Sequence, residues 1–134
     1  MDVRGSDYTG IPYLESGRDR NGIDCWGLVR LFLSEQAGID LPSYSGQYDS
    51  GGPFNENEPH ISSQAEPLGW KPVQSQLYQR FDVLLFHVQG KLHCGVMMDP
   101  LHFIEARMGL DSGSTRLTRG WRRAIRAVYR HSPS

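Results

Sequence analysis

The fold is decided by the stretch GIDCWGLVR, residues 22–30, which predicts the start of an amphipathic helix. Asp24 is a good N-cap, because its carboxylate can accept a hydrogen bond from the N–H groups of the first turn. From Cys25 to about Gln36 the apolar residues recur with helical spacing. Gly38 stands where a left-handed residue commonly ends a helix. We therefore expect a helix whose first residue is the cysteine.

A cysteine at this position lies in a local field that favours the thiolate. The N-terminus of a helix presents unpaired N–H groups and a partial positive charge, and both lower the pKa of a thiol. His93 lies in a later predicted strand and could act as the partner of Cys25. A cysteine and a histidine are the smallest set of side chains that nucleophilic cysteine catalysis requires. Glu105, in the next predicted strand, could orient the imidazole as the third member. We predict Cys25, His93 and Glu105 as the catalytic residues.

Alternation along the strand bears on how the second cysteine is placed. Side chains change face at each residue, so His93 and Gly95 share one face while Cys94 points to the other. If His93 faces Cys25, then Cys94 faces the core, and a disulfide between Cys25 and Cys94 is excluded. Gly95 would then keep the face beside His93 open and leave room for a substrate backbone.

Length and composition favour one domain and exclude several classes of protein. A chain of 134 residues predicts a single domain over 1–134, large enough to bury a core without staples. A formal net charge of −1 argues against a general nucleic-acid binder. No apolar run approaches the roughly 20 residues that span a bilayer. The N-terminus lacks the charged segment followed by an apolar segment that is typical of a secretion signal.

Cysteine and histidine spacing favours neither a disulfide scaffold nor a metal site. Two cysteines are too few for a disulfide framework. No pair of Cys or His residues has the short spacing of a zinc site, although His87, His93 and His102 cluster in the sequence. We expect no metal and no cofactor, and we interpret His87 and His102 as structural or surface residues.

The second half of the chain is predicted to form strands. Buried or alternating patterns cover 81–88, 92–98 and 102–106, and the first two would pair as a hairpin. The alternation in 124–130 suggests a final edge strand. One helix packed on a small antiparallel sheet is an α+β arrangement, which is the predicted fold class.

Two regions could form interfaces. Residues 43–72 are rich in Gly, Pro, Ser and Asn, and predict a loop-rich functional segment or a partner-binding insertion. The C-terminal arginine run is commonly a solvated face, and the alternative is contact with an acidic protein or an anionic wall polymer. Its members are Arg116, Arg119, Arg122, Arg123, Arg126 and Arg130. Trp70 and Trp121 are interpreted as core or loop anchors.

The residue pattern resembles the NlpC-type cell-wall peptidases, a compact branch of the papain-like cysteine peptidases. Residues 11–13, followed by Gly17, resemble the Pro-Tyr loop of that family. Residues 24–29 resemble its nucleophile helix. Residues 93–96 and 103–106 resemble the histidine strand and the strand of the third polar residue. The sequence of residues 17–31, GRDRNGIDCWGLVRL, resembles the family members that are encoded in phage and prophage tail-assembly genes.

This resemblance implies the NlpC-type fold and a cysteine endopeptidase that cuts the peptide stem of bacterial cell wall, between D-glutamate and a diamino acid. Cys25 would attack the amide carbonyl, and His93 would protonate the leaving amine and then activate water. The third position is usually His, Asn or Gln in the family and is Glu105 here. The substrate-binding residues implied are Tyr13, Asp24, Trp26 and Gly95.

The resemblance also implies a setting, in which a phage tail or phage-like particle delivers the enzyme to the periplasm or cell wall. The protein would be made in the bacterial cytoplasm without a signal peptide. The alternative is a tail-tip assembly subunit that keeps the peptidase fold as a docking module, with segment 43–72 or the arginine-rich end as its interface. An amidase or acyltransferase with the same Cys-His chemistry is a third possibility.

Overall fold

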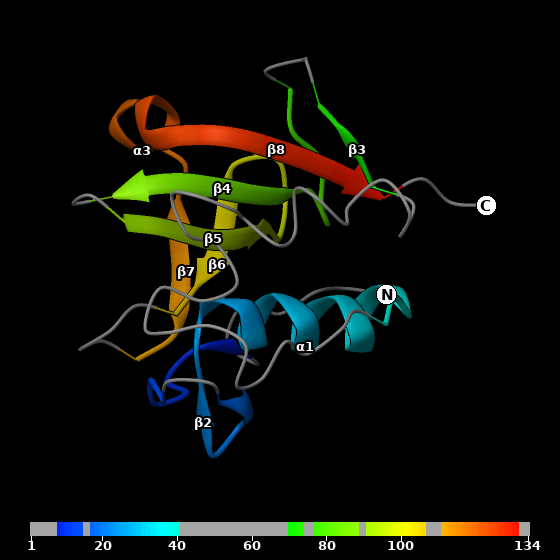
Figure 1. The fold of residues 1–134 in the computed structure, drawn as a ribbon, viewed down its shortest axis with the longest axis vertical. Coiled ribbons are helices and arrows are strands. Elements are labelled where there is room, and N and C mark those ends of the chain that lie inside the picture. The colour runs from blue at the N-terminus through cyan, green and yellow to red at the C-terminus, as the bar shows by residue number, and fades with distance from the viewer. Residues whose placement is uncertain are drawn as a thin grey trace.

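The computed structural model describes residues 8–14, 17–40, 70–73, 77–88, 91–106 and 111–131. Helix α1 (Cys25–Ala37) lies against one face of a six-stranded antiparallel sheet, and helix α3 (Arg119–Ala124) lies on the other side (Figure 1). The sheet order is β3-β8-β4-β5-β6-β7. Its strands are β3 (Trp70–Pro72), β4 (Val83–Val88), β5 (Lys91–Met97), β6 (His102–Glu105), β7 (Gly113–Arg116) and β8 (Ile125–His131). A small hairpin of β1 (Arg18–Asp19) and β2 (Gly22–Ile23) precedes α1. The predicted α+β class is confirmed.

The caps of α1 match the sequence prediction at both ends. The Asp24 carboxylate accepts a hydrogen bond of 2.7 Å from the Gly27 N–H and so satisfies a first-turn donor. Gly38 ends the helix with a φ of 67°, in the left-handed region that glycine enters without steric cost. The observed helix ends at Ala37, one residue beyond the predicted end.

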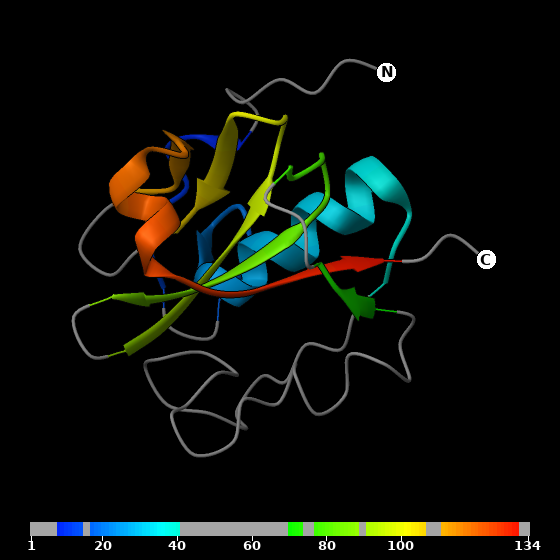
Figure 2. The same cartoon turned by 90° about the horizontal axis from the view of Figure 1, so that it is seen from above.

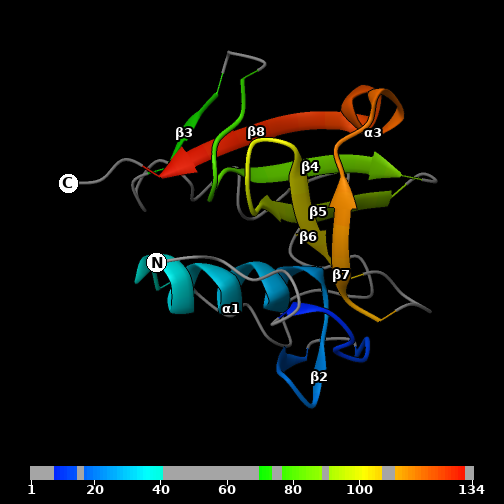
Figure 3. The ribbon, with the colours of Figure 1, turned by 180° about the vertical axis from the view of Figure 1, so that it is seen from behind.

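The sheet buries both faces because each has its own apolar cluster. Figure 2 shows α1 crossing the strands on one face, and Figure 3 shows β7 leading into α3 on the other. The α1 face presents Val83, Leu85, Cys94, Val96 and Ile104. The opposite face presents Leu84, Phe86, Met97 and Phe103, with Trp121 of α3 packed against them. Residues therefore alternate between the two clusters along β4 and β5, as a pleated strand requires.

The prediction of an edge strand at the C-terminus is wrong. β8 lies inside the sheet, between β4 and β3, with Leu84 paired to Val128 and Lys71 paired to Arg130. The edge is β3, which falls within the segment 43–72 that was expected to be loop. The remaining positions of that segment, 43–69, lie outside the described residues. Alternation in a sequence identifies a strand but not its neighbours, which are set by long-range pairing.

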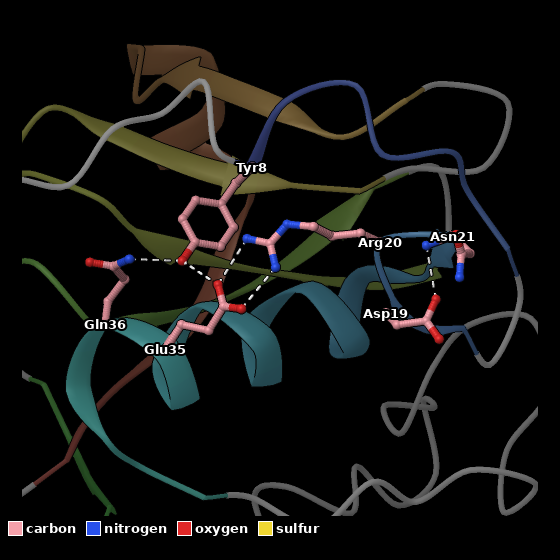
Figure 4. Close-up of polar contacts among 6 residues, drawn as sticks. All are labelled: Tyr8, Asp19, Arg20, Asn21, Glu35 and Gln36. Atoms are coloured by element: carbon pink, nitrogen blue, oxygen red, sulfur yellow. Dashed lines mark hydrogen bonds and ion pairs between the residues drawn. The ribbon is translucent and has the colours of Figure 1, made fainter.

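A polar network fastens the N-terminal segment and the β1–β2 hairpin to α1 (Figure 4). Arg20 binds the Glu35 carboxylate with both of its terminal nitrogens, at 2.8 and 2.9 Å. The Tyr8 hydroxyl donates to Glu35 at 2.9 Å and accepts from Gln36 at 2.9 Å. The hydrogen bonds from Arg20 lower the pKa of the Glu35 carboxyl against the opposing effect of burial. Both elements that precede Cys25 are thus tied to its helix.

Candidate active site

The thiol of Cys25 lies at the first position of α1, directly after the N-cap. It is 6% exposed, and the neighbouring side chains that act on its pKa are His93 and Cys94. The hydrogen bond from Cys94 and the hydrogen bond and positive charge of His93 hold the pKa of the Cys25 thiol well below its usual range, although burial opposes them. The predicted nucleophile therefore lies where a thiolate is favoured.

His93 lies on β5 between the thiol and a carboxylate. Its Nε2 is 3.0 Å from Oε1 of Glu105, and its ring stacks on Phe86 with the centroids 6.1 Å apart. Burial alone would lower the pKa of the imidazole, but the hydrogen bonds to Cys25 and Glu105 and their charges raise it to about 9. The structure thus brings all three predicted catalytic residues into one chain of contacts.

Glu105 is buried, with 4% of its surface exposed, and its two oxygens have different partners. Oε1 is within hydrogen-bonding distance of His93, and Oε2 accepts a hydrogen bond of 2.6 Å from the Thr115 hydroxyl. Sequence reasoning missed Thr115, since β7 reads GSTR and has no apolar alternation to mark it as a strand. A carboxylate in this position can orient and stabilise an imidazolium.

The prediction from strand alternation that Cys94 faces away from Cys25 is wrong. It requires Cys94 to face away from Cys25 if His93 faces it, yet Cys94 lies in the core cluster that contains Cys25, and both His93 and Cys94 lower the pKa of the Cys25 thiol. Both residues pair regularly with β4, His93 with Phe86 and Cys94 with Leu85, and Cys94 belongs to the core cluster on the α1 face that contains Cys25. Cys94 is fully buried in the core, as predicted, and both cysteines are free thiols.

Tyr13 lies beside the chain that leads into the nucleophile. It forms a parallel bridge with Ile23, whose N–H donates to the Pro12 carbonyl at 2.9 Å and whose carbonyl accepts from the Leu14 N–H at 3.1 Å. The Tyr13 side chain is half-buried and packs against the core cluster that contains Cys25. Its role in binding substrate stays a prediction that this position supports.

Asp24 and Trp26 are each 1% exposed, so their side chains present almost no surface. The Asp24 carboxylate is engaged as the helix cap, and the Trp26 ring belongs to the core cluster. Substrate binding by either side chain stays a prediction, and their burial argues against it. The position of both residues favours a role in holding Cys25 in place.

Gly95 does not leave open space for a substrate. A Cβ at this position would lie 2.8 Å from the Ile104 carbonyl oxygen and 3.0 Å from a ring carbon of Phe103. Glycine is therefore required by the close approach of β6. The reason given for Gly95 from the sequence is wrong, because the volume beside it is filled by the next strand.

Gly27 has a comparable steric role in the nucleophile helix. A Cβ there would lie 2.2 Å from the Gly17 carbonyl oxygen and 2.8 Å from a side-chain carbon of Ile23. Real Cβ atoms do not approach so closely, so only glycine lets the loop of Gly17 pack against the first turn of α1. Gly27 therefore allows the segment that precedes Cys25 to pack closely against the first turn of the helix.

Ser112 joins the N-terminal segment to β7, and no pattern in the sequence marks it. Its hydroxyl donates to the Tyr8 carbonyl at 2.7 Å and accepts from the Ile11 N–H at 2.9 Å. Its backbone N–H also donates to the Ile11 carbonyl at 2.9 Å, and its carbonyl accepts from Gly10 at 2.8 Å. The segment that leads to Tyr13 is therefore held against the strand that contains Thr115.

The remaining candidates have structural partners or lie on the surface. His102 is 3.0 Å from Asp99 in the turn before β6, and His87 is exposed. Trp121 contacts Phe86 and Phe103, which confirms it as a core anchor, whereas the Trp70 side chain lies outside what the structure describes. In the arginine run, Arg130 is paired with Asp82 and Arg122 lies over the Tyr78 ring. Exposed members are Arg116, Arg119, Arg122, Arg123 and Arg126.

Across the described part of the chain, no group of three His, Cys, Asp or Glu side chains could hold a metal ion. The helices within the same residues are too short or too polar to cross a bilayer.

We expect Cys25 and His93 to form a thiolate–imidazolium pair that begins well below the usual pKa of a thiol and persists to about pH 9. The lowered pKa of the thiol sets the acid side, and loss of the imidazolium proton near pH 9 sets the alkaline side. Alkylation of Cys25 by iodoacetamide, followed by peptide mass mapping across pH, measures the thiolate. In His93→Ala the midpoint should return toward about 8.5. A wild-type midpoint near that value would contradict the ion pair.

Known proteins resemble this chain in both sequence and fold. The model of the NlpC/P60 family matches residues 10–130. The fold is similar to that of the NlpC/p60 domain of the peptidoglycan hydrolase SagA, with a TM-score of 0.60, 18% identity, and coverage of 96% of this chain and 92% of that one. No curated protein sequence matches the chain significantly.

Two further structures are similar. One is a lipoprotein-like NLP/P60 family protein from Staphylococcus aureus subsp. aureus Mu50, with a TM-score of 0.64, 20% identity and coverage of 97% of this chain. The other is a NlpC/P60 family protein from Bacillus cereus ATCC 10987, with a TM-score of 0.64, 21% identity and coverage of 96%. The similarity spans only 39% and 38% of those two chains.

Proposed function

The chain belongs to the NlpC/P60 family, and on this premise we propose that it is a cysteine peptidase that hydrolyses amide bonds in the peptide stem of peptidoglycan. The observation that carries the proposal is the Cys25 thiol at a helix N-terminus, whose pKa His93 lowers, together with the buried Glu105 carboxylate 3.0 Å from the imidazole of His93. Peptidoglycan is supported as the substrate by the structurally similar SagA domain, which is described as that of a peptidoglycan hydrolase.

The geometry supports a two-step hydrolysis. The Cys25 thiolate would attack the amide carbonyl carbon, and the N–H groups of the first turn of α1 would stabilise the negative charge that develops on the oxygen. The His93 imidazolium would give its proton to the leaving amine, which leaves a thioester on Cys25. Neutral His93 would then take a proton from water as the water attacks the thioester. Glu105 would keep the imidazole oriented during both steps.

We propose that the bond cut lies between D-glutamate and the diamino acid of the stem, as the resemblance implies. The test is product analysis by mass spectrometry after incubation with defined stem peptides, with protein alkylated at Cys25 as the control. The expected products are an L-alanyl-D-glutamate fragment and a fragment that begins at the diamino acid. Cleavage elsewhere would correct the linkage. No cleavage of any stem peptide or of purified cell wall would contradict the proposed activity.

We also propose a phage tail or phage-like particle as the setting, and delivery by the particle to the periplasm or cell wall. This part of the proposal is supported by the sequence resemblance of residues 17–31 to tail-assembly peptidases. Tail-tip proteins are the proposed partners, through segment 43–72 or the exposed arginines. A folded protein that is present in such particles but leaves every stem peptide intact would favour the alternative of an assembly subunit.

A further inference from the structure

We propose that Thr115 is a positioning residue of the active site, which holds Glu105 in the orientation that supports His93. The inference rests on the proposed function, since it assigns a fourth member to the same chain of contacts. Pairing of β6 with β7 brings the two residues together. Thr115 on β7 and Glu105 on β6 lie diagonally across the ladder, because Phe103 pairs with Thr115 and Glu105 pairs with Gly113.

The division of partners between the two carboxylate oxygens is the first argument. Thr115 Oγ1 donates to Oε2 of Glu105 at 2.6 Å, while Oε1 of the same group is 3.0 Å from Nε2 of His93. With one oxygen fixed by a hydroxyl, the other is held in line with the imidazole. A rotation of the carboxylate toward His93 or away from it would break one of the two contacts.

The burial of Glu105 is the second argument. Its side chain is 5% exposed and that of His93 is 11% exposed, so solvent cannot readily replace a lost donor. A neutral hydroxyl stabilises the carboxylate anion without adding a positive charge that would compete with the imidazolium. The β-branched threonine is also restricted at χ1, so its hydroxyl is presented with little conformational freedom.

The place of Thr115 in the sheet is the third argument. β7 is the last strand in the order β3-β8-β4-β5-β6-β7 and has only four residues. Ser112, just before it, is bound to Tyr8 and Ile11 of the N-terminal segment. The N-terminal segment thus holds the start of β7, and pairing with β6 holds the strand itself. The Thr115 hydroxyl is therefore presented to Glu105 at a defined position.

The test compares Thr115→Val, which keeps the shape and removes the donor, with Thr115→Ser, which keeps the donor. In the valine variant we expect kcat on stem peptides to fall about tenfold, the scale of one lost charge-assisted hydrogen bond, with KM little changed. The pH midpoint of Cys25 alkylation should move to higher pH by about half a unit, because a loosened carboxylate stabilises the imidazolium less and the imidazolium then stabilises the thiolate less. The serine variant should remain within about twofold of wild type in both measurements.

The outcomes separate this inference from the proposed function. Unaltered alkylation and kcat in a folded Thr115→Val variant would overturn the positioning role. A fall in kcat without a shift in the alkylation profile would also overturn it, since it would indicate a purely structural effect. If no stem peptide is cleaved but the profile shifts in valine and is restored in serine, the positioning role stands and the proposed substrate fails. A wild-type thiol of ordinary pKa would overturn both.

Discussion

Cys25→Ala should reduce hydrolysis of stem peptides to the background rate, a loss on the order of 10⁴-fold or more in kcat. In the proposed mechanism only the thiol forms a covalent bond with the substrate, so neither His93 nor Glu105 can replace it. Alanine removes one atom from a site that is 6% exposed, and the N-cap by Asp24 does not depend on the side chain. The measurement is product formation by mass spectrometry together with clearing of purified cell wall.

The matched control is His102→Gln, which alters a histidine on the strand of Glu105 but outside the chain of contacts. His102 pairs with Asp99 in a turn, and we expect this variant to keep activity close to that of wild type. Thermal unfolding of both variants shows whether the fold is retained. Equal hydrolysis by the wild type and a folded Cys25→Ala variant would contradict the nucleophilic role.

Local patterns predicted the elements that hold the chemistry. The helix start, its N-cap and its left-handed end were read from Asp24, Cys25 and Gly38, since each depends on neighbours within a few residues. The partnership of His93 with Glu105 also followed from their strands. These residues were found because nucleophile, base and orienting acid are residue types that few other roles require in this order.

What the sequence could not give was the relation between strands. Thr115 and Ser112 are small polar residues in short polar stretches, and only the pairing of β6 with β7 reveals their partners. Cys94 is predicted to lie in the core but not beside Cys25, because alternation along one strand does not show which residues of other elements a side chain meets. Gly95 was misread for the same reason, since the atoms that exclude its Cβ belong to β6. Such contacts join residues that are far apart in the sequence, and a local pattern does not reveal them.

The ion pair of Asp82 with Arg130 is another contact between distant parts of the chain, and it has a large expected effect on stability. Asp82 is fully buried at the start of β4, and its oxygens accept bonds of 2.8 Å from Nε and from a terminal nitrogen of Arg130 on β8. It also accepts a bond of 2.8 Å from the Gln79 N–H. The arginine therefore neutralises a carboxylate that has no access to solvent.

Arg130→Met should lower the free energy of unfolding by about 3 kcal/mol, because it leaves a buried carboxylate without its cation. For a domain of this size the loss corresponds to a melting temperature lower by about 10 °C. The matched control is Arg126→Met on the same strand, an exposed position where the change should stay within about 0.5 kcal/mol. Adding Asp82→Leu to Arg130→Met should recover part of the loss, since the uncompensated charge is then removed. Equal stability of the two single variants, measured by urea unfolding, would show that the pair contributes nothing to the junction of β4 and β8.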